Sequence, residues 1–169
     1  MTKGIDAARV LAPVQDEGVR TEYLQSLRLI ERLHRLLLDV IKDEFDRLGG
    51  SDLNSVQALL LYNIGEAELT AGELKSRGHY LGSNVSYNLK KLVDMGYIHY
   101  KRSETDKRSV RVSLTQKGLD ACKVVQKLYQ RQLGSIEAVG GVNSDDFRGL
   151  NRALMRLERF WSDQIRYRL

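Results

Sequence analysis

The chain has 169 residues, of which 42% are hydrophobic and only one is proline, so it can bury a core but does not resemble a proline-punctuated, all-β protein. A formal net charge of +5 is compatible with an anionic partner, although net charge alone is weak evidence. The first eighteen residues lack the apolar core of a secretory signal, no apolar run reaches membrane-spanning length, and the single cysteine excludes an intramolecular disulfide. We therefore expect a cytoplasmic protein with no membrane segment.

The positive charge is concentrated in one third of the chain. Residues 75–131 contain 13 Lys or Arg and 4 Asp or Glu, a balance of +9, which leaves −4 for all other residues. Such a concentration is typical of a surface that binds a polyanion.

The first predicted elements are an arm and a long helix. Residues 1–19 contain the only proline and little periodic pattern, so we expect a flexible arm. Residues 20–48 carry apolar side chains at three- and four-residue spacing, which predicts an amphipathic helix. Gly49 and Gly50 follow it, as glycine often does at a helix C-terminus.

Two short helices are predicted next. Asn54 is a suitable N-cap for a helix that ends at Gly65. Thr70 and Glu73 have the spacing of a capping box, which predicts that a second short helix starts there.

A third short helix is predicted over residues 83–95, with Ser83 or Asn84 as its cap. At 100° per residue, the side chains expected to face the core are Val85, Leu89, Leu92 and Val93. The opposite face is polar and basic and consists of Ser83, Asn84, Ser86, Tyr87, Lys90 and Lys91. Hydroxyl, amide and phenol groups can reach base edges and phosphates while lysines neutralise the backbone, so this face suits the DNA major groove.

A basic hairpin follows the third helix. Residues 97–102 and 110–114 alternate like strands and are joined by the charged loop SETDKRS. The cations of this predicted wing are Lys101, Arg102, Lys107, Arg108 and Arg111. A ribbon with a basic tip beside a groove-reading helix can cross the phosphate backbone into the minor groove.

Two long helices complete the chain. Thr115 is predicted to cap a helix that extends to Ile136 and is broken by the glycines at 140–141, and Ser144, followed by two acids, starts the last helix. The apolar stripes of the long terminal helices exceed what a domain of this size can cover, so we expect two copies to pack together.

The order of elements predicts a mainly α (α+β) fold: a winged helix-turn-helix over residues 53–115, between helical dimerisation regions at 20–48 and 116–169. A solvated surface explains either the basic helix or the basic hairpin alone, but not both in this order. The competing interpretation is a winged-helix module that binds protein and does not read DNA. The balance of +9 over residues 75–131 favours double-stranded DNA.

The stretch VSYNLKKLVDMGYIHYKRSETDKRSVRVSLTQKG resembles the recognition helix and wing of the MarR family of bacterial transcription regulators. The family's D-x-R wing motif is matched at residues 106–108, its L-T-x-x-G wing exit at 114–118, and its helix entry by Asn54 and Gln57. The stretch RLHRLLLDVIKDEF is also similar to the regulators of L,D-transpeptidase genes within this family.

The resemblance implies a homodimer on a pseudo-palindromic operator, with Arg108 in the minor groove and Asp106 bracing the wing, for example by pairing with Arg102. Where the family often has Ser-Arg in the recognition helix, this chain has Ser86 and Tyr87. Base reading by an arginine at that position is therefore lost.

The resemblance also implies a small aromatic effector, for which the candidate residues are His34, Arg35, Tyr62 and Tyr129; packing and surface charge explain these residues equally well. We find no zinc-ligand spacing, phosphate loop or catalytic motif, and so expect no cofactor, no metal and no enzyme activity. Cys122 lies on an apolar stripe, which favours a small buried hydrophobe over a redox sensor.

Overall fold

The structure is a computed structural model that describes residues 16–70, 73, 83–102 and 110–167. The chain divides into two compact units. One consists of residues 32–132, and the other combines the residues before 32 with those after 132. Helix α2 (Glu17–Arg47) contributes to both units.

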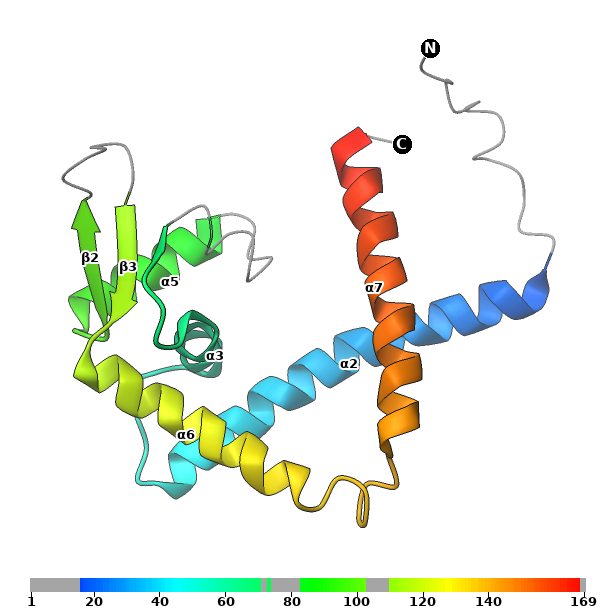
Figure 1. Ribbon diagram of the computed structural model, residues 1–169, viewed down its shortest axis with the longest axis horizontal. Helices are drawn as coiled ribbons and strands as arrows, with labels where there is room; N and C mark the ends of the chain where they lie inside the picture. Colours follow the sequence, from blue (N-terminus) through cyan, green and yellow to red (C-terminus); the bar gives the residue numbers. More distant parts are fainter. Residues whose placement is uncertain (1–15, 71–72, 74–82, 103–109, 168–169) are drawn as a thin grey trace. The chain divides into compact units, whose positions relative to one another are not determined.

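The unit of residues 32–132 has the predicted mainly α, winged helix-turn-helix architecture (Figure 1). After α2, its elements are α3 (Ser55–Ile64), β1 (Leu69–Thr70), α5 (Ser83–Asp94), β2 (Ile98–Arg102), β3 (Val110–Leu114) and α6 (Gln116–Leu133). Of the second predicted short helix, only Glu73 is among the described residues.

The three strands form an antiparallel sheet in the order β1-β3-β2. Val112 at the centre of β3 lies opposite Tyr100 on one side and Leu69 on the other. Strand β2 starts one residue later than predicted. Tyr97 was expected to begin it, but the amide of Tyr97 instead donates to the carbonyl of Leu92 at 2.8 Å and so belongs to the C-terminal turn of α5. Strand β1 was not predicted, since two residues are too few to show alternation.

Two clusters of apolar side chains form the core of this unit. The cluster beneath the sheet comprises Leu60, Leu61, Ile64, Leu69, Leu92, Tyr97, Ile98, Val112, Leu114 and Ala121. The second joins α2, α3 and α6 and comprises Ile41, Ala58, Val125 and Leu128. The residues of both clusters lie at the apolar positions of their helices and strands. The sheet and α5 therefore pack against the same cluster.

The predicted caps of α3 and of the segment after it are confirmed. The side chain of Asn54 accepts from the amide of Gln57 at 2.9 Å, and the side chain of Gln57 accepts from the amide of Asn54 at 3.1 Å. Thr70 and Glu73 make the same reciprocal pair, at 3.1 Å and 2.7 Å.

Three helix boundaries differ from the prediction. Helix α2 begins at Glu17 instead of residue 20, because the side chain of Asp16 accepts from the amide of Gly18 at 2.8 Å and caps it. Residues 17–19, assigned to the arm, are therefore helical. Helix α5 already includes Ser83 and Asn84, so neither is its cap. Helix α6 ends at Leu133, before Ile136.

The other unit contains α7 (Ser144–Tyr167). Its cap is Asn143, whose side chain accepts from the amides of Asp145 at 2.8 Å and Asp146 at 3.1 Å; the helix begins at Ser144, as predicted. The two acids lie in the first turn as predicted.

The apolar stripe of α7 is uncovered within one chain. All of its residues are described and none is buried. Its exposed large apolar side chains include Phe147, Leu150, Leu154, Met155, Phe160 and Ile165. The first half of α2 similarly exposes Val19, Tyr23, Leu24 and Leu29. Among the described residues, no helix has the length and apolarity needed to cross a bilayer.

Candidate nucleic-acid interface

The inner face of α5 is fixed in the core, as predicted. Leu92 is fully buried, and Leu89 and Val93 pack against the cluster beneath the sheet. Gly96 then ends the helix with φ 76°, a conformation that favours glycine, and its amide donates to the carbonyl of Val93 at 2.9 Å. The side chain of Val85 lies outside the described residues. Because one face is held, the opposite face has a defined direction.

The outer face of α5 is basic. Tyr87 is 59% exposed, and Lys90 and Lys91 are exposed beside it. The ammonium of Lys91 lies 5.7 Å from the centroid of the Tyr87 ring, a weak cation–π contact at an exposed site. Ser83, Asn84 and Ser86 belong to α5, but their side chains lie outside the described residues. The face thus offers a phenol and two ammonium groups to a polyanion.

Asn88 helps to hold α5 in place, a role that the sequence analysis did not predict. Its side-chain oxygen accepts from the side-chain nitrogen Nε2 of buried Gln57 at 3.3 Å, which ties α5 to α3. Gln57 also belongs to the cap of α3, so the cap and the link share one side chain. Asn88 is four residues before Leu92, so it lies next to the apolar stripe of the helix. This spacing was the sequence signal that could have predicted an inward-facing Asn88.

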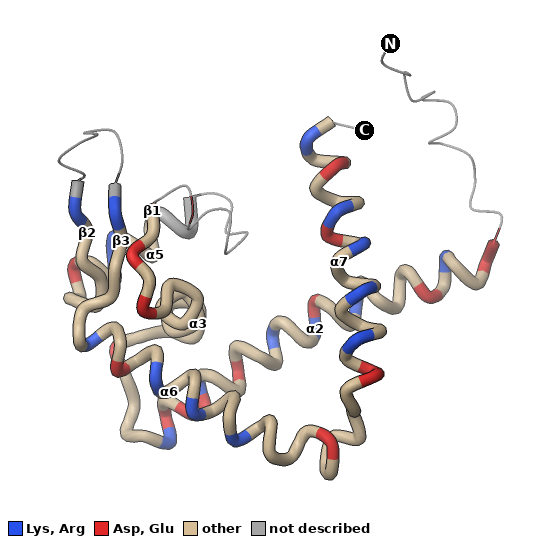
Figure 2. Tube along the Cα trace, viewed as in Figure 1, with Lys and Arg blue, Asp and Glu red and all other residues tan. Residues whose placement is uncertain are grey.

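The described part of the wing carries cations on both strands. Lys101 of β2 and Arg111 of β3 are directly opposite each other and exposed. Figure 2 shows these charges at the C-terminal end of β2 and the N-terminal end of β3. Arg111 lies 3.8 Å from a carboxylate oxygen of Glu68, but both side chains are about half exposed, so the pair is weak. Arg102 is the last residue of β2, and its side chain is not among those that the structure describes. Asp106, Lys107 and Arg108 lie outside the described residues.

The wing exit is joined to the end of α5 by the L-T-x-x-G stretch. The hydroxyl of Thr115 donates to the carbonyl of Gly96 at 2.7 Å and accepts from the amide of Gly118 at 3.1 Å, so it caps α6 as predicted. A Cβ atom on Gly118 would lie 2.2 Å from the carbonyl oxygen of Tyr97. Glycine is therefore required at position 118 for the first turn of α6 to pack this closely against Tyr97, the residue before β2.

Asp52, Tyr97 and Lys117 form a polar cluster at the same junction. The hydroxyl of Tyr97 donates to Asp52, and the ammonium of Lys117 lies 3.3 Å from Asp52 and 4.1 Å from the Tyr97 ring centroid. The hydrogen bond from Tyr97, and then that from Lys117, lowers the pKa of Asp52. The cluster fixes the base of the wing relative to α3 and α6.

The candidate effector residues fall into two groups. Tyr62 and Tyr129 meet edge to face, with ring centroids 5.0 Å apart, beside the second apolar cluster. His34 and Arg35 are exposed on α2.

Cys122 behaves as the buried-hydrophobe interpretation predicts. It is half-buried and packs against the cluster beneath the sheet. Burial, followed by the charge of Glu66, raises the pKa of its thiol, which disfavours the thiolate that a redox sensor needs. Within the described ranges, no group of three or more His, Cys, Asp or Glu could hold a metal ion.

A helix with a buried apolar face and an exposed basic face, followed by a basic two-stranded wing, defines a winged helix-turn-helix DNA-binding protein. Residues 53–118 match the family model of the winged helix DNA-binding domain. The chain is 38% identical over 174 residues to the exopolysaccharide II synthesis transcriptional activator ExpG of Rhizobium meliloti strain 1021, with 98% of this chain and 84% of ExpG covered.

Solved structures show the same fold. The transcriptional regulator SlyA superposes with a TM-score of 0.70 at 19% identity, covering 85% of this chain and 98% of SlyA. A mutant MarR from E. coli complexed with operator DNA gives 0.65 at 23% identity, covering 84% and 99%. The chain belongs to the same family as ExpG, has the fold of MarR family regulators, and is a DNA-binding transcription regulator. These comparisons do not test the L,D-transpeptidase subgroup, which stays a prediction.

Proposed function

We propose that α5 enters the major groove of an operator while β2 and β3 cross the neighbouring phosphate backbone. The observation that carries this proposal is the exposed face of Tyr87, Lys90 and Lys91 on a helix whose other face is held in the core. By the family resemblance, Arg108 would enter the minor groove, where a narrow A·T-rich stretch has an enhanced negative potential.

The salt dependence of binding tests the phosphate contacts. Among the described residues of α5 and the wing, the exposed cations are Lys90, Lys91, Lys101 and Arg111, which are four per protomer. If each neutralises one phosphate, these cations release counterions at about eight sites of a dimer and contribute about −7 to the slope of log affinity against log salt. Fluorescence anisotropy with a duplex selected from a random DNA pool measures this slope.

Single substitutions locate the contact on α5. Lys90→Ala removes one phosphate contact from each protomer and should reduce the slope by about 2. Lys42→Ala is the matched control, because Lys42 is an exposed lysine of α2 that pairs with Asp46 outside the proposed interface. An unchanged slope for Lys90→Ala would contradict the docking of α5.

Tyr87 is proposed to read a base. Tyr87→Phe keeps the ring but removes the hydroxyl, so the selected sequence should lose its preference at one position of each half-site while the salt slope stays unchanged. Repeating the selection with this variant measures the change, and an identical selected sequence would contradict base reading by the phenol.

We propose that two copies form the binding unit. The uncovered stripes of α7 and of the first half of α2 expose more large apolar side chains than an isolated chain would normally leave in water. A palindromic sequence recovered by selection from a random DNA pool would show the twofold symmetry expected of two copies. Sedimentation should give twice the monomer mass, and a monomer at micromolar concentration would refute the proposal.

Two finer features of the proposal come from relatives. Because the Rhizobium relative is named a transcriptional activator, we propose activation here, to be tested by a reporter whose output should rise with the selected operator upstream of a weak promoter. A small aromatic effector near Tyr62 and Tyr129 is proposed from the family resemblance. Tyr62→Leu should then reduce the effect of that molecule on operator affinity.

A further inference from the structure

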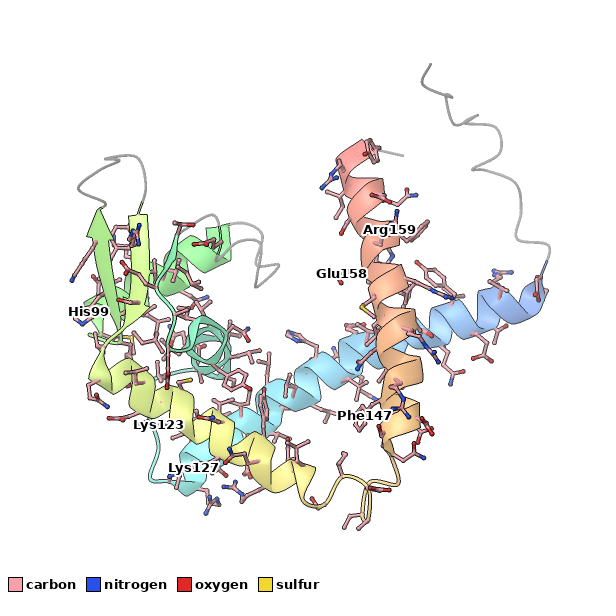
Figure 3. The ribbon with its side chains drawn as sticks, in the orientation of Figure 1. His99, Lys123, Lys127, Phe147, Glu158 and Arg159 are labelled. Carbon is pink, nitrogen blue, oxygen red and sulfur yellow. The ribbon has the colours of Figure 1, made fainter. Side chains whose placement is uncertain are left out.

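One side chain of α3 bonds to two elements at once. The side-chain oxygen of Gln57 accepts from the amide of Asn54 at 3.1 Å, while its side-chain nitrogen donates to the side-chain oxygen of Asn88 at 3.3 Å. Gln57 is only 4% exposed, so water has little access to either bond. Side chains of α3 fill the space between this helix and the sheet, and α5 packs against the same cluster (Figure 3).

The cap of α3 fixes which way round the side-chain amide of Gln57 lies. A backbone amide can only donate, so the oxygen of Gln57 must face Asn54 and its nitrogen must face α5. Asn88 has to meet that nitrogen with an acceptor, which its side-chain oxygen provides. The orientation of one side chain on α5 is therefore set from the N-terminus of α3.

The bond to Asn88 opposes a motion that the other contacts of α5 allow. The apolar side chains of its inner face hold the helix by packing, which has no preferred direction. The hydroxyl of Thr115 donates to the carbonyl of Gly96, but this bond lies at the end of the helix. Asn88 is half-buried at the edge of the inner face, where a directional bond opposes rotation about the helix axis.

A small rotation of α5 would change what its outer face can contact. Side chains on a helix surface lie about 5–6 Å from its axis, so a rotation of ~20° moves them by about 2 Å. Hydrogen bonds to base edges tolerate a spread of only about 0.5 Å in length. Tyr87 directly precedes Asn88 and is exposed, so its position would shift with such a rotation.

We propose that Gln57 and Asn88 set the rotation of α5 and thereby determine which base its outer face reads. Both are positioning residues, because Gln57 is buried and the side-chain oxygen of Asn88 is turned toward α3. The inference rests on the proposed entry of α5 into the major groove. It predicts a loss of sequence discrimination without a loss of overall affinity, because phosphate contacts supply the sequence-independent part of binding.

The test measures the ratio of two affinities of the full chain, for the duplex selected from a random DNA pool and for a random duplex, by fluorescence anisotropy. Asn88→Leu keeps the size of the side chain but removes the acceptor, so this ratio should fall about tenfold. Affinity for the random duplex should stay within about twofold, because Lys90 and Lys91 are unchanged. An unchanged ratio, or an equal loss of affinity for both duplexes, would overturn the proposal.

Two further substitutions at the same position separate positioning from stability. Asn88→Ala leaves room for water on the nitrogen of Gln57, so it costs less stability than leucine but should lower the ratio as much. Asn88→Asp keeps an acceptor for that nitrogen, and its added charge weakens binding to both duplexes alike, so its ratio should stay within about threefold of the parent's. A ratio that falls as far for Asn88→Asp as for Asn88→Leu would show that the bond to Gln57 is not the cause.

Asn54→Ala is the matched control within α3. It removes the side-chain half of the cap but leaves the backbone amide that orients Gln57, so α3 is destabilised while the ratio should stay unchanged. A ratio that falls as far as in Asn88→Leu would assign the effect to stability and contradict the proposal. If Lys90→Ala leaves the salt slope unchanged, the docking of α5 itself is wrong and this inference falls with it. If Lys90→Ala lowers the slope as proposed while Asn88→Leu keeps the ratio, only the positioning role is wrong.

Discussion

Replacing Glu44 by glutamine should make stability depend less on pH. In the folded chain this carboxylate accepts hydrogen bonds from Arg47 and Arg131, which join α2 to itself and to α6. The Glu44→Gln variant would keep the shape of the side chain but lose the charge that holds both guanidinium groups. The pH dependence of the loss in stability distinguishes an effect of the charge from an effect of packing.

The magnitude follows from the shift in pKa. The pKa of Glu44 falls from its ordinary 4.5 to about 2. At about 1.4 kcal/mol for each unit, complete linkage would give ~3 kcal/mol. Because the side chains of both arginines are more than half exposed, water screens these pairs, and we expect ~1–2 kcal/mol. A lowered folded pKa means that this stabilisation is present above pH 4.5 and is lost as the pH falls toward 2.

Urea denaturation of the parent chain and Glu44→Gln at one protein concentration measures the difference. A fixed concentration is needed because association of two copies adds to the apparent stability. The parent should be more stable by ~1–2 kcal/mol near pH 7, and the gap should close between about pH 4.5 and pH 2. A gap that stays constant over this range would refute the reasoning, because it would show that packing, and not the charge of Glu44, causes the loss.

Three further substitutions test the supports of the interface. Gly118→Ala forces a Cβ atom to within 2.2 Å of the carbonyl oxygen of Tyr97, so thermal denaturation should show a loss of ~1–3 kcal/mol together with weaker operator binding. Asn54→Ala removes the reciprocal cap with Gln57 and should cost ~1 kcal/mol by urea denaturation; a cost near zero would contradict the cap. Tyr97→Phe removes the main hydrogen bond that lowers the pKa of Asp52, so NMR titration should show that pKa rising toward its ordinary value, and no change would assign the lowering to Lys117 instead.

Features determined by neighbouring residues could be predicted from the sequence. The cap of α3, the two faces of α5 and the alternation of β3 depend on periods of three to four or of two residues, which one sequence displays directly. Asn54, Leu92 and Val112 accordingly lie where their patterns place them. The cap of α5 and the start of α2 were wrong, because several neighbouring polar residues can cap a helix equally well and only the backbone decides among them.

Contacts between distant segments could not be predicted. Glu44 and Arg131 are 87 residues apart, and Asp52 and Lys117 are 65 apart. In the sequence each is one charged residue among many, and only the packing of α2 and α3 against α6 selects the pairs. Strand β1 was missed for a related reason, since Leu69 is recognisable as a strand residue only beside its partner in β3.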